Sequence, residues 1–430
     1  MVTPEADAAS PRSGMRAVAS RAASFAGVTV ITQILALASG LIVVRAMSKE
    51  DYALYAIATA TVGASGVLAD SGLNSILIAS AGRARRAGRS VVPPFLAAHE
   101  VRRRMLLIVV PAFGLFTLYL LLANGGGTAS SLVMVALVAA TVWPEANASL
   151  YRMILQIGDR VSVIQWVTLA VAIGRLVLVV TLWMVPRSLL LPFLAVQALA
   201  SVAQLILMRK HARVIMCDRP EQERDDLKPY VKALWNVLPQ NIVLVASPQL
   251  ITLALTLEGN SAAIAEIAAL SRFGMVMVVL QQVVGNVAAP LVALSSESRR
   301  ATNKALVVIV GGMTVAVAGF VVVTALASDL LLRILGPGYE NLHDELVLIA
   351  IGSGLSTIAG YALGVINHAR GWTSYSWVYV PLFMIWAVIA LTTLDLSTSM
   401  GAVLMVASLP LVDVVTQIIR LSVGYRRLTE

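Results

Sequence analysis

The chain has 430 residues, of which 58% are hydrophobic and only 13% are charged. Soluble proteins carry about 25% charged residues, so this composition excludes an ordinary soluble protein and predicts one that lies in lipid. Its net charge of +9 makes it important to know on which side of a membrane each positive charge lies. The single cysteine, Cys217, excludes a disulfide framework and a Cys-based metal cluster.

The N-terminal residues 1–21 are rich in small and polar side chains, and a long apolar run follows them. That run lasts about 20 residues, the length that crosses a hydrocarbon core of ~30 Å. It lacks an A-x-A-like cleavage site, so we expect a first membrane helix and no cleaved signal peptide. Six such runs precede a charged central segment and six follow it. The expected spans are 22–44, 53–78, 105–123, 132–150, 161–185, 189–208, 233–255, 262–284, 305–327, 345–367, 374–394 and 402–419.

The basic residues predict the orientation of these spans, because Lys and Arg near helix ends are retained in the cytoplasm. Nearly all of the 32 Lys and Arg fall in one alternating set of connections. The other set holds only Arg45, Lys49, Arg187 and Arg333. We therefore expect twelve helices with both termini in the cytoplasm. The Arg-rich stretch after Gly82 and the triplet 102–104 are interpreted as topology signals.

The central segment 209–232 mixes basic and acidic residues. Clustered Lys and Arg can indicate nucleic-acid binding, but its acids leave little net charge, so we expect a linker and no nucleic-acid partner. The expected organisation is a cytoplasmic segment at 1–21, an N-lobe at 22–208, the linker at 209–232, a C-lobe at 233–420 and a cytoplasmic tail at 421–430.

Several kinds of chemistry have no motif in the chain. No G-x-x-x-x-G-K-[ST] loop occurs, so direct use of ATP is not expected. The four histidines are far apart and lack the i, i+4 pairing of a helical metal site. We therefore assign no metal, no cofactor and no enzymatic activity.

Ionisable side chains inside spans are functional candidates, because each costs roughly 2.5 to 3.5 kcal/mol at the helix centre. Arg175 lies mid-span, with Gln165 on the same helical face. Arg272 lies about ten residues into the eighth span, followed by Gln282. These residues are candidates to line a cavity that attracts an anion. The alternative is that each arginine pairs with an acid to tie helices together.

Three acids are candidates for ion coupling or for charge balance. Glu145 and Asp413 are the deepest acids in the fourth and twelfth expected spans, and Asp70 lies toward the cytoplasmic end of the second. Two arginines at depth, one in each half, favour an anionic cargo over a cationic one.

Three stretches resemble signatures of the polysaccharide transporter and oligosaccharide flippase family. Residues 42–78 include Arg45 at the end of the first helix and the turn SKEDYALY. Residues 268–297 resemble the family's eighth helix, with its arginine at Arg272. Residues 329–352 carry the core LGPGY, similar to the family's outer loop after the ninth helix. One departure is Leu54, where the family usually has Gly.

The resemblance implies membership of the multidrug/oligosaccharidyl-lipid/polysaccharide exporter superfamily. The implied fold is an all-α polytopic membrane protein, with two six-helix lobes around a central cavity that works by alternating access. The implied function is translocation of an undecaprenyl-diphosphate-linked oligosaccharide across the bacterial inner membrane. That function includes the lipid bilayer and polysaccharide assembly proteins as partners, and it adds Arg45 to the cavity candidates.

Other functions remain open at this stage. A cation-coupled multidrug exporter of the same superfamily would favour an acidic, aromatic-lined cavity. A membrane-embedded polymerase or ligase would need a sizeable outer loop, and the longest expected here is 328–344. A structural scaffold has no need for Arg175 and Arg272 within the membrane.

Overall fold

The computed structural model describes residues 11–185, 190–216, 226–284, 298–370 and 376–426, with the single residues 292, 372 and 428. Within these residues the chain is almost entirely helical and forms no β-strand. This all-α architecture confirms the fold class expected from the apolar runs.

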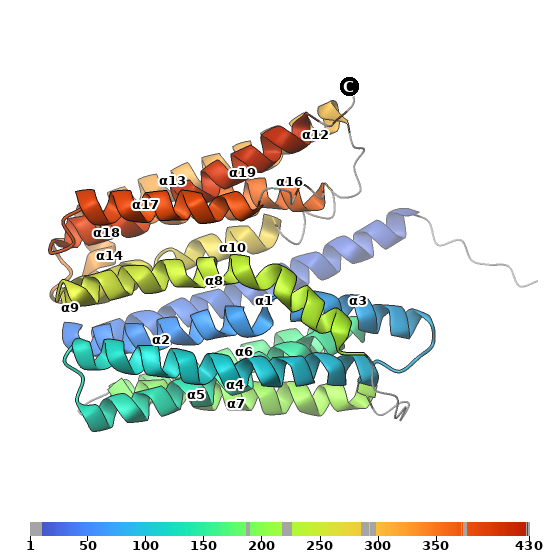
Figure 1. Ribbon diagram of the computed structural model, residues 1–430, viewed down its shortest axis with the longest axis horizontal. Helices are drawn as coiled ribbons and strands as arrows, with labels where there is room; N and C mark the ends of the chain where they lie inside the picture. Colours follow the sequence, from blue (N-terminus) through green and yellow to red (C-terminus); the bar gives the residue numbers. More distant parts are fainter. Residues whose placement is uncertain are drawn as a thin grey trace, which may run out of the picture.

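The first half of the chain forms a group of seven helices. They are α1 (Pro11–Arg45), α2 (Lys49–Asp70), α3 (Leu73–Arg86), α4 (Val92–Ala123), α5 (Thr128–Ile157), α6 (Val161–Trp183) and α7 (Leu190–Met216). Helix α5 packs along α7, and α1 packs along α6. These helices form the lower part of the bundle in Figure 1.

The second half begins with α8 (Lys228–Leu257) and is more interrupted. The other helices are α9 (Ser261–Leu270), α10 (Met275–Val283), α12 (Arg299–Ala305), α13 (Gly312–Leu326), α14 (Ser328–Leu335), α15 (His343–Thr357), α16 (Gly364–Ala369), α17 (Tyr379–Thr393), α18 (Ser399–Ser408) and α19 (Pro410–Tyr425). Wider π-helical turns, η2 (Leu306–Gly311) and η3 (Ile358–Leu363), join α12 to α13 and α15 to α16, and the short η4 (Ser376–Val378) precedes α17.

The number of spans approaches the expected twelve. Among the described residues, 9 helices are long and apolar enough to cross a membrane, or up to 11 if each of two bent pairs counts as one span. The shorter apolar helix Tyr379–Thr393 lies where a further span is expected. The count of twelve therefore stays a prediction.

Several expected boundaries differ from the structure, among them those of the second span, the eighth span and the linker. The second span, expected to be continuous over 53–78, is divided between α2 and α3, because Ser71 and Gly72 adopt φ values of 29° and 86°. Positive φ cannot continue a right-handed helix. The linker expected at 209–232 is partly helical, since α7 extends to Met216 and α8 begins at Lys228. Residues 217–225 lie outside the described residues.

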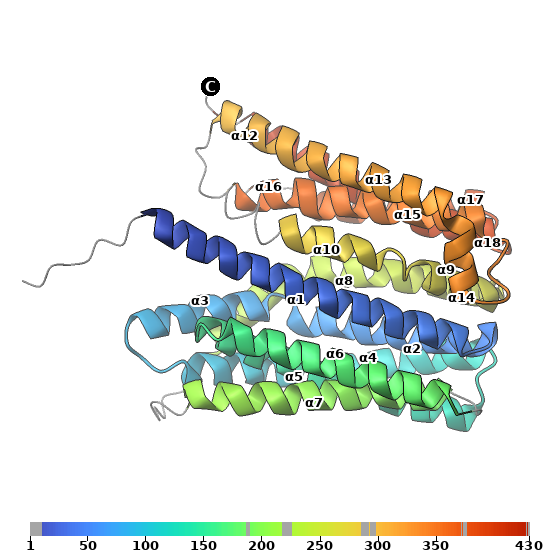
Figure 2. The same ribbon diagram turned by 180° about the vertical axis from the view of Figure 1, so that it is seen from behind.

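The two groups of helices form two lobes that diverge toward one end of the bundle. In Figures 1 and 2 the lobes lie close together where α9 and α14 lie, and farther apart where α12 lies. The described start of α1 and the end of α19 lie at the divergent end (Figure 1). The basic connections lie at this end as well, so we call it the cytoplasmic end and the opposite end the outer end.

The buried side chains explain why the lobes converge at the outer end. One large cluster runs through both lobes there and includes Val43, Leu120, Leu255 and Leu335. Toward the cytoplasmic end the buried clusters are smaller. Two of them join the N-lobe to α8 alone, and two others lie within the C-lobe. Apolar packing therefore holds the lobes together mainly at the outer end.

Candidate functional site

Arg272 lies at a break in the helical backbone. Helices α9 and α10 meet at 42° across the four residues between them, and Arg272 is one of these. Its Nε donates a hydrogen bond to the Tyr52 hydroxyl of α2 at 3.2 Å. A Cβ added at Gly40 of α1 would lie 3.2 Å from the Arg272 Cδ, so the arginine packs closely against this glycine. Arg272 of the C-lobe is therefore held against two helices of the N-lobe.

The guanidinium of Arg272 retains capacity for a ligand. Among the described residues it has the Tyr52 hydrogen bond but no ion pair with a carboxylate. A guanidinium has five N–H donors, so the two Nη nitrogens of this half-buried side chain remain available. Such a group recognises a phosphate or carboxylate through two parallel hydrogen bonds.

An apolar pocket begins one helical turn beyond Arg272. It has a volume of about 430 Å³ and lies between α1, α10 and α13. Its walls include Ile34, Met275 and Phe320, and Gln33 is the one amide side chain among its lining residues. The pocket therefore lies at the boundary between the two lobes, next to the break that carries Arg272.

A second, polar pocket lies inside the N-lobe, between α1, α5, α6 and α7. It has a volume of about 190 Å³, and Glu145 and Arg175 both line it. Glu145 interacts electrostatically with Arg175 and with Arg152, but none of the described ion pairs joins them directly. Ser39, only 1% exposed, also lines the pocket, and its hydroxyl has no hydrogen-bond partner among the described residues.

The predicted cavity residues thus occupy separate places. Arg175 lines the N-lobe pocket, whereas Arg272 contacts the boundary between the lobes. Gln165 is half-buried one turn before the pocket residue Thr168. Gln282 is exposed near the end of α10. Arg45 is exposed at the outer end of α1, beside Gly336.

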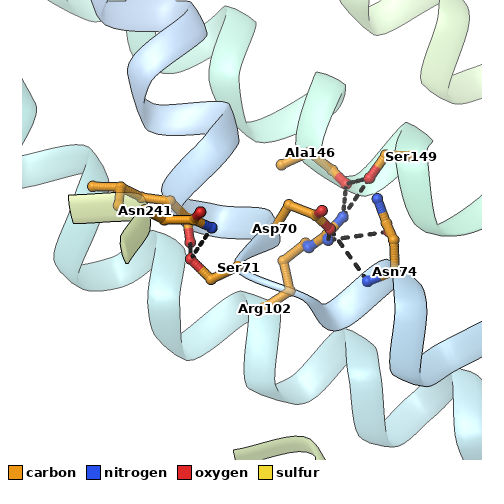
Figure 3. Close-up of polar contacts among 8 residues, drawn as sticks. Asp70, Ser71, Asn74, Arg102, Ala146, Ser149 and Asn241 are labelled. Atoms are coloured by element: carbon orange, nitrogen blue, oxygen red, sulfur yellow. Dashed lines mark hydrogen bonds and ion pairs between the residues drawn. The ribbon is translucent and has the colours of Figure 1, made fainter. Parts of the chain in front are cut away.

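Asp70 lies in a polar cluster where α2 ends (Figure 3). The Arg102 Nη2 donates to Asp70 Oδ1 at 2.7 Å and to Asn74 Oδ1 at 3.3 Å. Its Nη1 donates to the Ala146 carbonyl and the Ser149 hydroxyl of α5. Arg102 is 0% exposed, and its ion pair with Asp70 ties α4 to the break between α2 and α3.

Arg102 was missed as a special residue when the triplet 102–104 was interpreted only as a topology signal. The sequence did contain a signal for its burial. The buried positions of α4 include Phe95, Ala98, Val101 and Leu106, and Arg102 falls on the same helical stripe. Arg103 and Arg104 are exposed and pair with Glu100, at 3.1 and 2.9 Å.

Asp413 occupies the first turn of α19 and is half-buried. It interacts electrostatically with Arg420 and Tyr379. On the same helix, Gln417 accepts a hydrogen bond from the Asn367 amide at 2.8 Å. Within the part of the chain that the structure describes, no group of three or more His, Cys, Asp or Glu could hold a metal ion.

A family model described as "Polysaccharide biosynthesis protein" matches residues 18–288, more than half of the chain. The chain belongs to this polysaccharide biosynthesis protein family. The matched region includes the break at Arg272 and both helices that hold it. No curated protein sequence gives a match.

Solved structures of transporters share the fold. A multidrug resistance MATE family transporter of the MOP superfamily, in an inward-facing conformation, has a TM-score of 0.64 at 12% identity, over 93% of this chain and 96% of that chain. The eukaryotic MATE transporter AtDTX14 has a TM-score of 0.59 at 12% identity, over 95% and 99%. The lipid II flippase MurJ, in an inward closed conformation, has a TM-score of 0.58 at 13% identity, over 93% and 87%. The fold is therefore that of MATE and MurJ transporters, and the protein is a multi-pass membrane protein.

Proposed function

We propose that this protein is a flippase that carries an undecaprenyl-diphosphate-linked oligosaccharide across the bacterial cytoplasmic membrane, for O-antigen, capsule or exopolysaccharide synthesis. The observation that carries the proposal is Arg272, whose Nη donors remain available one turn from an apolar pocket at the lobe boundary. A charged group beside an apolar pocket matches an amphiphile.

The two parts of such a cargo have different requirements. Its diphosphate is a dianion or more, which a guanidinium binds through paired, charge-assisted hydrogen bonds. Its prenyl chain gains nothing by leaving an apolar environment, so it can remain in lipid or in the pocket formed by Ile34, Met275 and Phe320. The head would then cross between the lobes by alternating access, while the chain stays at membrane depth.

A cation-coupled multidrug exporter of the same superfamily is the second candidate. The MATE family names of two matching structures favour it, but likeness at this identity carries only the fold. The lobe boundary presents an arginine at Arg272, whereas a cationic drug would need an acid there. The family to which the chain belongs also favours the flippase.

The N-lobe pocket is the proposed place of ion coupling. Glu145 is a carboxylate that can take up a proton, and Arg175 and Arg152 lie within electrostatic range of it. Asp70 and Asp413 are assigned to charge balance, with Arg102 and Arg420. Arg45, Gln165 and Gln282 remain candidates for contacts with the saccharide. Polysaccharide assembly proteins are the expected partners of this flippase.

The direct test is Arg272→Ala, with export of lipid-linked oligosaccharide as the readout. We expect export to fall at least a hundredfold while the protein accumulates normally in the membrane. The matched control is Arg333→Ala, because Arg333 is an exposed arginine of α14 at the outer end. Export at the parental rate in Arg272→Ala would contradict the proposal. An equal loss of export in both variants would show that the effect is not specific to Arg272.

A further inference from the structure

A group of polar contacts joins the lobes at the outer end. Lys49, the first residue of α2, approaches Glu266 of α9 with an Nζ–Oε1 distance of 2.6 Å. The second carboxylate oxygen, Oε2, accepts a hydrogen bond from the Ser399 hydroxyl at 2.5 Å. Glu266 is only 5% exposed. Both of its oxygens are thus bound, one by the N-lobe and the other by the C-lobe.

The loop after α14 covers Lys49 from the C-lobe side. The Lys49 Nζ lies 5.1 Å from the centre of the Tyr339 ring, a distance that allows a cation–π interaction. Burial raises the pKa of the Tyr339 hydroxyl well above its ordinary value, so the ring stays neutral. Gly338 adopts a φ of 94°, and a Cβ there would lie 3.2 Å from the Lys49 Cε. Glycine therefore allows the loop to close over this lysine.

A second layer of contacts lies one helical turn deeper. Tyr52 follows Lys49 at i+3 on α2, and Arg272 follows Glu266 after the end of α9. The Tyr52 hydroxyl accepts the hydrogen bond from Arg272, and its ring stacks on Tyr55 at 6.0 Å. The two layers therefore join the same pair of helices, with Arg272 at the inner face.

These contacts bring together three stretches that are far apart in the sequence. Lys49 and Tyr52 belong to the turn SKEDYALY, Tyr339 to the core LGPGY, and Arg272 to the eighth expected span. A separate contact between lobes, from the Asn124 amide to the Thr256 hydroxyl at 2.9 Å, closes the same end. The large buried cluster that runs through both lobes surrounds them.

We propose that Lys49, Glu266, Ser399 and Tyr339 form an outer lock, and that Tyr52 positions Arg272 at its inner face. The lobes can separate at the outer end only if the Lys49–Glu266 pair breaks, which leaves a carboxylate without its cation. Arg272 belongs both to the inner face of the lock and to the proposed cargo site. Tyr52 therefore acts on closure and on cargo, whereas Lys49 and Glu266 act on closure.

The lock itself does not depend on the identity of the cargo, so it can be tested without it. In the full-length protein, the native cysteine is replaced in Cys217→Ser and a reporter is introduced by Ala53→Cys. Ala53 is 1% exposed and lies one turn from Lys49 on α2. The readout is the rate at which a membrane-impermeant maleimide, added at the outer face of proteoliposomes, labels the reporter.

We expect Glu266→Gln and Lys49→Met each to raise the labelling rate at least tenfold. The double variant should be no faster than either single variant, because both remove the same pair. Glu50→Gln is the matched control, since Glu50 is the exposed neighbour of Lys49, and it should label at the parental rate. Parental rates in both single variants, or additive effects in the double variant, would overturn the lock. Equal amounts of folded protein on size-exclusion chromatography separate opening from unfolding.

The role of Tyr52 rests on the proposed function and has its own readout, the binding of farnesyl diphosphate to detergent-solubilised protein. Tyr52→Phe removes only the hydroxyl, and we expect it both to speed labelling and to weaken probe binding about tenfold. Glu266→Gln should leave probe binding unchanged. Unaltered binding in Tyr52→Phe would overturn the positioning role. Absence of probe binding in the parent protein would count against the proposed cargo and leave the labelling result intact.

Discussion

Arg102 and Arg272 both lie where helices meet, and they differ in their partners. Arg102 is fully buried, pairs with Asp70 and donates to the Ala146 carbonyl and the Ser149 hydroxyl. Arg272 has the Tyr52 hydroxyl as its hydrogen-bond partner and no paired carboxylate among the described residues. The first arginine is electrically neutralised, whereas the second keeps a charge that a ligand can use.

The difference shows how an arginine in a membrane protein can be assigned. A buried arginine with a carboxylate and several acceptors stabilises the structure, because removing either partner leaves an uncompensated charge. Replacing an arginine that is held by a single hydroxyl lowers the free energy of unfolding only slightly. The presence of such an arginine at a lobe boundary therefore indicates a functional role. The partners of an arginine therefore indicate its role better than its depth in the membrane does.

The largest expected effect comes from removing the buried Arg102 from its pair with Asp70. Arg102→Met should lower the free energy of unfolding by about 1.5 to 3 kcal/mol, because it removes the charge-assisted hydrogen bonds of a buried guanidinium, while Asp70 is 39% exposed and can be hydrated. Arg272→Met should cost only about 1 kcal/mol, the worth of one hydrogen bond. Unfolding of the detergent-solubilised variants, followed by circular dichroism, measures both. Equal losses in the two variants would contradict the contrast between these arginines.

A smaller effect is expected where Arg272 lies against α1. Gly40→Leu places a side chain where the Arg272 guanidinium lies, and overpacking of this kind costs about 1 to 3 kcal/mol. The rate of export should fall as well, because the new side chain displaces Arg272. Gly27→Leu is the matched control on the same helix, since nothing lies within 4 Å of a Cβ at that position. If both variants export equally, the close approach of Arg272 to α1 has no functional role.

The smallest effect is expected next to Arg102 in the sequence. Arg103 is 54% exposed and pairs only with Glu100 in the described structure. Exposed pairs of this kind contribute little, so Arg103→Ala should change the free energy of unfolding by less than about 0.5 kcal/mol. The same unfolding measurement, run beside Arg102→Met, checks this. A loss of several kcal/mol would mean that the triplet acts as one unit.

Much of the fold could be predicted from the sequence, because hydrophobic length and the placement of Lys and Arg are properties of the chain itself. The long helices and the alternation of connections followed from these properties, whereas the family resemblance followed from the residues of three separate stretches. Breaks were harder to predict. The division of 53–78 at Ser71 and Gly72 depends on positive φ values, which apolar length does not reveal.

The candidate site was predicted less completely. Arg272 was singled out because a charge inside an apolar run is costly, and the structure places it at the boundary between the lobes. Glu266 lies in the same expected span but was not singled out, and its pairing with Lys49, 217 residues away in the sequence, could not be predicted from the chain alone. Arg175 and Arg272 were expected to share a cavity, but Arg175 lines a pocket within the N-lobe.

The sequence by itself determined that this protein crosses the membrane many times, which end carries the positive charge, and which side chains are costly in lipid. These conclusions need only composition and spacing. The tertiary structure decided which costly side chains are neutralised by a partner and which are not. Arg102 and Arg103 are adjacent in the chain, yet one is buried with Asp70 and the other is exposed. Ion pairs depend on distances between helices, and those distances exist only once the lobes are packed.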